Sequence, residues 1–160
     1  MEERPAAESP TLGYVVVLIG VLGFVVSCFL PYAEVVGAPR GYSVTLYRLL
    51  TLGDAALAAA GGLLLPFAGA ATIALISFAA LMRPRVWAFP ALAAASIVWS
   101  LTSIGLLLGA YGFYSSMNVG YWLIGISIAV VVLGTILVGR SVRARNGRQA
   151  RGTLIEEPPG

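Results

Sequence analysis

The most concentrated chemical feature of the sequence is a set of arginines near the C-terminus. Half of the ten arginines fall within twelve residues after a long apolar run: Arg140, Arg143, Arg145, Arg148 and Arg151. Beside an anionic membrane leaflet each contributes about 1 kcal/mol of binding free energy. We expect this cluster to fix the depth of the preceding helix and bind anionic lipids, or to dock on an acidic cytoplasmic partner. We expect no nucleic-acid binding.

A second polar pattern lies within an apolar segment. Ser96, Ser100 and Ser103 recur at i, i+4 and i+7, with Trp99 beside them, so they share one face of a helix. One interpretation is a polar groove that accepts a lipid headgroup or a small solute. The other, which we favour, is hydrogen bonding between helices, worth about 0.6 kcal/mol per bond in a membrane.

Catalytic patterns are not found in the sequence. Histidine is absent, and no phosphate-binding loop or nucleophile–base pair occurs. Glu34 and Asp54 are lone carboxylates, which we expect to form surface ion pairs with Arg40 and Arg48 or, for Asp54, to cap a helix N-terminus. We therefore predict no enzyme activity, no metal site and no cofactor.

The single cysteine, Cys28, has two interpretations. Residues 25–28 resemble the lipobox of bacterial lipoproteins, in which the cysteine is acylated. However, the chain starts with acidic residues, and Phe29 and Leu30 continue the apolar run where a polar linker would be expected. We favour Cys28 as a small buried hydrophobic residue.

The composition and the charge-free runs of the sequence predict that these residues lie on or beside membrane-spanning helices. The 160 residues are 59% hydrophobic and 11% charged, whereas a soluble domain has about 25% charged residues. Residues 86–139 carry no charge and would be roughly 80 Å long as one helix, so they must fold back near residues 109–120. We predict an all-α integral membrane four-helix bundle with a short structured outer loop between helices 1 and 2. The predicted spans are 13–31, 55–82, 86–110 and 119–139, between a disordered arm (1–12) and a basic, disordered tail (140–160).

Arginine placement predicts the orientation. With the N-terminus inside, the inner segments hold eight arginines and the outer segments hold two, Arg40 and Arg48. The positive-inside rule therefore places both termini in the cytoplasm.

Most tyrosines fall in the outer segments, which indicates a small aromatic cap there. The segment Gly41–Tyr47 alternates like a strand, yet Tyr42, Leu46, Leu49 and Leu50 fit one face of a helix. Either structure, or a strand that leads into a short interfacial helix, agrees with the pattern.

Small residues in the spans predict close helix packing. Gly105-xxx-Gly109 and Gly125-xxx-Ala129 are small-xxx-small pairs, which pack helices within the bundle or dock it on the helices of a partner. Pro66 and Pro90 should kink or loosen the second and third spans.

Three short motifs suggest a family. Phe29-Leu30-Pro31-Tyr32, the glycine-containing outer loop and Leu52-Gly53-Asp54 resemble a pattern of small four-helix membrane proteins of actinobacteria. The resemblance implies an accessory subunit of a larger envelope machine in the bacterial cytoplasmic membrane, such as an MCE-type lipid importer or a respiratory complex. We therefore expect a non-catalytic accessory or stabilising subunit. The alternative is an autonomous passive carrier or channel for an uncharged or lipid-like solute.

Overall fold

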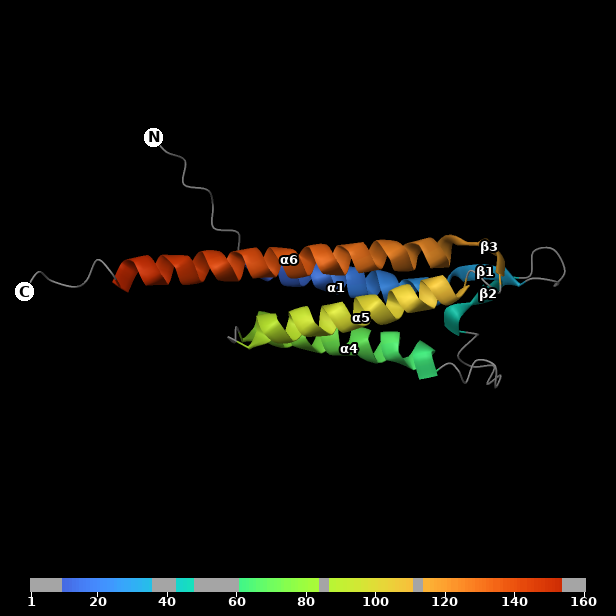
Figure 1. Ribbon diagram of the computed structural model, residues 1–160, viewed down its shortest axis with the longest axis horizontal. Helices are drawn as coiled ribbons and strands as arrows, with labels where there is room; N and C mark the ends of the chain where they lie inside the picture. Colours follow the sequence, from blue (N-terminus) through green and yellow to red (C-terminus); the bar gives the residue numbers. More distant parts are fainter. Residues whose placement is uncertain (1–9, 36–42, 48–60, 84–86, 111–113, 154–160) are drawn as a thin grey trace, which may run out of the picture.

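The computed structural model describes residues 10–35, 43–47, 61–83, 87–110 and 114–153 (Figure 1). Four helices in this part of the chain are long and apolar enough to cross a membrane. They are α1 (Pro10–Ser27), α4 (Gly61–Met82), α5 (Ala88–Ala110) and α6 (Val119–Thr153). At 1.5 Å per residue the 23 residues of α5 extend about 34 Å, enough for a hydrocarbon core of about 30 Å. The predicted all-α four-helix bundle is confirmed, and its length and composition are those of a multi-pass membrane protein.

The start of α1 differs slightly from its prediction. The helix begins at Pro10, inside the predicted disordered arm, because proline is favoured in the first turn of a helix. It ends at Ser27, four residues before the predicted boundary, where the chain turns into a strand. Residues 55–60 of the predicted second span and Asp54 lie outside the described residues.

The end of α6 corrects the prediction more substantially. The sequence predicts a disordered tail from Arg140, whereas α6 continues without a break to Thr153. Two physical effects account for the difference. Arginine, alanine and glutamine have high helix propensity, and a helix already nucleated in the membrane is extended at little cost. Residues 140–153 are called the basic arm below; residues 154–160 lie outside the described part of the chain.

The closest approach in the bundle is between antiparallel α1 and α6, along small residues spaced by seven. They are Gly13, Gly20 and Ser27 on α1, and Gly120, Ser127, Gly134 and Ser141 on α6. A Cβ atom on Gly134 would lie 2.7 Å from the backbone nitrogen of Val17, and one on Gly20 would lie 3.0 Å from that of Val131. Each backbone therefore lies where a side chain of the other helix would be. We call this contact the glycine seam.

The other three helix contacts close a ring in the order α1, α4, α5, α6. Aromatic edges join the first three helices: Phe24 of α1 packs edge-on against Phe67 of α4 and Trp99 of α5, with ring centroids 5.4 Å apart in both pairs. Trp99 also lies against Gly69 of α4. Phe89 of α5 packs against Gly139 and completes the ring to α6.

A three-stranded antiparallel sheet closes one end of the bundle. It consists of β1 (Pro31–Val35), β2 (Ser43–Thr45) and β3 (Tyr114–Met117), in the order β2-β1-β3. Ala33 pairs with Val44 on one side and with Met117 on the other. A helical turn begins directly after β2 at Leu46 and Tyr47, which agrees with a strand leading into a helix. β3 was expected to be only part of a turn; it forms because β1 supplies a pairing partner.

Aromatic side chains pack this sheet against the helices. Tyr32 is buried, its ring centroid lies 5.8 Å from that of Tyr121, and its hydroxyl donates to the Leu106 carbonyl at 3.4 Å. Phe29 stacks on Tyr47 with centroids 5.4 Å apart. The sheet and these aromatic residues together are called the cap, and the predicted aromatic cap is present in this form.

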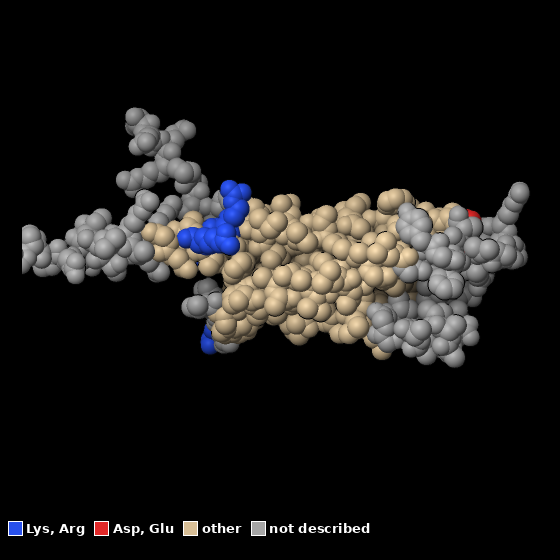
Figure 2. All heavy atoms as spheres, in the orientation of Figure 1, with Lys and Arg blue, Asp and Glu red and all other residues tan. Residues whose placement is uncertain are grey.

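Charges separate to the two ends of the molecule. Figure 2 shows arginines at the end opposite the cap and an acidic side chain at the cap, with an uncharged surface between them. No charged residue occurs in α1, α4, α5 or the part of α6 before Arg140. Exposed leucine, isoleucine, valine and phenylalanine side chains cover this surface. This is the surface that a helix bundle presents to lipid.

Candidate functional sites

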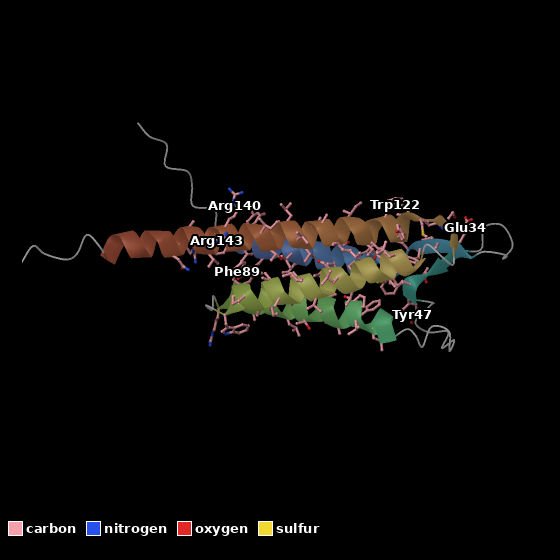
Figure 3. The ribbon with its side chains drawn as sticks, viewed as in Figure 1. Glu34, Tyr47, Phe89, Trp122, Arg140 and Arg143 are labelled. Atoms are coloured by element: carbon pink, nitrogen blue, oxygen red, sulfur yellow. The ribbon has the colours of Figure 1, made fainter. Side chains whose placement is uncertain are left out.

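The basic arm extends beyond the rest of the bundle. α6 reaches well past the start of α1 in Figure 1, and Gly13 of α1 lies at the level of Val138. Arg140, Arg143 and Arg145 are exposed, and Arg140 and Arg143 lie at the opposite end of the molecule from Glu34 (Figure 3). The helix continues through positions 148 and 151, whose side chains lie outside the described part. The basic arm contains five arginines and no acidic residue.

The length of this arm sets what it can contact. From Arg140 to Thr153 a helix rises about 20 Å, whereas the headgroup layer on each side of a bilayer is about 5–7 Å thick. An arm that continues the direction of α6 therefore carries its first arginines at the headgroups and its later positions into water.

Three serines on α5 were predicted to share one face. In the structure they differ in whether their hydroxyls have a hydrogen-bond partner. Ser96 is buried, and its hydroxyl lies 3.1 Å from that of Thr135 on α6. This is the interhelical hydrogen bond that we favoured from the sequence. Ser100 and Ser103 have buried hydroxyls with no hydrogen-bond partner among the described residues.

Two further buried polar atoms in the described residues have no hydrogen-bond partner: the Ser77 hydroxyl on α4 and the indole N–H of Trp99. Sequence reasoning placed Trp99 beside the serines but did not assign its N–H a role. Its position one turn before Ser103 is the signal that could have indicated one.

Three of the four residues of the predicted small-residue pairs take no part in the helix contacts of the described residues. A Cβ added to Gly105 or to Gly125 would meet no atom of the described chain within 4 Å, and Ala129 is exposed. Gly125 is two residues from Ser127 of the glycine seam, so it faces roughly 200° away from α1. The surroundings of Gly109 lie outside the described residues.

Cys28 lies at the junction of α1 and the cap. Its side chain is 2% exposed, and its thiol donates to the Phe24 carbonyl at 3.2 Å. Phe24, Tyr32 and Leu46 belong to the same buried cluster. The geometry is that of a small buried group.

Other chemistry is sparse in the described residues. No group of three or more His, Cys, Asp or Glu residues there could hold a metal ion. The arrangement therefore offers two features for recognition: an exposed cationic helix beyond the apolar body, and buried, uncharged donors within that body. Comparison of the chain with protein-family models, curated protein sequences and solved structures finds no match.

Proposed function

We propose that this protein is a non-catalytic accessory subunit of a larger complex in the bacterial cytoplasmic membrane, with both termini in the cytoplasm. The observation that carries the proposal is the continuation of α6 as a helix through Arg143 and Arg145 to Thr153. A topology signal needs only charges near the end of a span. A helical arm about 20 Å long, by contrast, presents its charges in a fixed arrangement to something beyond the headgroups.

The reach of the arm favours a protein partner for its distal part. Arg140 and Arg143 stand closest to the apolar surface, where anionic lipids attract each by about 1 kcal/mol. That attraction falls off within a Debye length, about 8 Å at physiological ionic strength. The later positions of the arm are farther from the bilayer, so an acidic cytoplasmic face of a partner subunit is the better complement.

Small residues on the lipid-facing surface provide a second contact for such a partner. On α4 the exposed positions include Ala68, Ala71, Thr72 and Ala79, and the Thr72 hydroxyl is satisfied by the Ala68 carbonyl at 2.8 Å. Gly105 on α5 is exposed with open space around it. Small residues at these positions allow the backbone of another helix to approach closely. By resemblance, the complex is a lipid importer of the MCE type or a respiratory assembly.

Purification from the native membrane tests the proposal. An N-terminal tag leaves the arm free, and a mild detergent preserves membrane complexes. We expect one larger membrane complex in stoichiometric amount with the wild type, and its loss with Arg145→Gln/Arg148→Gln. Arg83→Gln removes an exposed arginine outside α6, at the end of α4, and should retain the complex. Recovery of the chain alone, or equal recovery with all three proteins, would overturn the proposal.

A passive carrier or channel for an uncharged solute is the second candidate, favoured by the unpartnered polar atoms on the buried face of α5. Such a protein acts without a partner. Purified chain in liposomes would then accelerate the passage of a small uncharged solute such as glycerol, whereas an accessory subunit would leave the flux at the lipid background.

A further inference from the structure

Three neighbouring residues of α5 each have a buried polar atom with no hydrogen-bond partner among the described residues. These atoms are the indole N–H of Trp99 and the hydroxyls of Ser100 and Ser103. Trp99 and Ser103 have no exposed surface, and as residues i and i+4 they occupy adjacent turns of one face. Trp99 is fixed in place by the edge-on contact with Phe24 and by Gly69.

Most hydroxyls in the described part of the bundle are satisfied locally, and the Ser77 hydroxyl on α4 is an exception. Six of them donate to a carbonyl one turn back in their own helix: Ser27, Thr72, Thr102, Ser127, Thr135 and Ser141. The ring of Trp99 instead packs on α1 and α4, and its indole N–H has no acceptor among the described residues. It therefore requires an acceptor that its own helix does not supply.

Buried donors in proteins nearly always have a partner, and in a membrane no bulk water is available to supply one. We infer that Trp99, Ser100 and Ser103 form a binding site for a small uncharged molecule that contributes an acceptor oxygen. Indole only donates and a hydroxyl both donates and accepts, so the matching group is a neutral oxygen. An ion is excluded because the described helices carry no charge at this depth to balance it.

Two molecules available to the site carry such an oxygen: water, and a lipid through its ester carbonyl. Ser100 is only partly buried as a residue, and Ile97, one turn before it, is 61% exposed. The site therefore borders the lipid-facing surface of α5. This inference is independent of the accessory function, because Trp99, Ser100 and Ser103 lie on α5 and not in the basic arm.

The indole N–H of Trp99 reports directly on occupancy. The full chain, labelled with ¹⁵N at its tryptophans, is placed in nanodiscs of phosphatidylethanolamine and phosphatidylglycerol. Trp122, which is 61% exposed, provides an internal reference, and Trp99→Phe assigns the signal. We expect a downfield, hydrogen-bonded Trp99 resonance. A cross-peak to water identifies water as the ligand, and one to lipid glycerol or acyl protons identifies the ester. An upfield resonance, or a downfield one with neither cross-peak, would overturn the inference.

Alanine substitutions provide a second readout that does not depend on a spectrum of the bound molecule. Ser100→Ala/Ser103→Ala should lower the melting temperature and shift the Trp99 resonance. Ser127→Ala, whose hydroxyl is satisfied by the Leu123 carbonyl at 2.7 Å, should leave that resonance in place. If the hydroxyls are simply unpaired, removing them stabilises the protein. A higher melting temperature for the double variant would therefore reject the site.

Discussion

At the scale of the residue, a glycine matters most where a neighbouring backbone occupies the place of a side chain. Gly134 is such a position, since its added Cβ would lie 2.7 Å from the Val17 backbone nitrogen. Gly134→Ala should force α1 and α6 apart and destabilise the protein by about 1–3 kcal/mol, the usual cost of overpacking. Thermal unfolding in detergent, followed by circular dichroism, measures the change.

Gly125→Ala is the matched control for this prediction. It lies on the same helix but has open space around it, so alanine should leave stability unchanged or raise it slightly through helix propensity. Equal losses of stability for the two variants would show that the glycine seam does not hold the helices as described.

The glycine seam also shows what the sequence leaves undetermined at this scale. A chain rich in alanine and glycine offers many small pairs, and the four-residue spacings at 105–109 and 125–129 are as good as any. The structure instead uses a seven-residue spacing on both α1 and α6. Choosing between them requires knowing which helix faces which, and that information is not local. Likewise, the serine spacing predicted a shared face, but only the position of Thr135 identifies Ser96 as the satisfied member.

At the scale of the element, the cap depends on the buried aromatic side chain of Tyr32. Tyr32 is 1% exposed, whereas Tyr47, which stacks on Phe29 at the same end, is 53% exposed. Tyr32→Ala should cost about 3–5 kcal/mol through the cavity that it leaves. Tyr47→Ala should cost less than about 1 kcal/mol, as is usual for exposed positions. The two unfolding free energies, measured side by side, test the prediction; similar values would contradict the described burial.

The basic arm gives a second prediction at this scale. Asn146→Pro removes a backbone donor and clashes with the carbonyl four residues earlier, so the helix should end near Arg143. Hydrogen exchange should then become fast from there to Thr153, while the melting temperature of the bundle is retained. Asn146→Ala should keep the slow exchange. Equally fast exchange in the wild type would show that the arm is not a stable helix.

Among the elements, the membrane spans could be predicted from the sequence, whereas β3 and the helical basic arm could not. Charge-free runs locate membrane helices because a charge in hydrocarbon is expensive. β3 has no strong signal of its own, since Ser115 and Ser116 are typical of turns and the strand exists only against β1. The arm was predicted to be disordered, whereas its attachment to a formed helix decides the outcome.

At the scale of the whole molecule, the proposed topology with four spans places both ends on one side of the membrane. The antiparallel seam brings Gly13, near the start of α1, level with Val138, two residues before the basic arm. In a Cys28→Ala background, single cysteines at Thr11 and Thr153 should resist a membrane-impermeant maleimide in intact cells and react after permeabilisation. Ser116→Cys, exposed in the cap, should react from outside. The reverse pattern would invert the proposed orientation, and labelling of the two ends from opposite sides would contradict the four-span architecture.

The glycine seam joins the first and the last helix, and this has a consequence for biogenesis. About 90 residues separate the end of α1 from the start of α6, so at 5–20 residues per second the ribosome takes roughly 5–20 s to deliver the partner. During that time α1 sits in the bilayer with Gly13 and Gly20 uncovered, and β1 has no β3. A chain that terminates before α6 would therefore leave this face of its very first helix without the partner that covers it in the complete bundle.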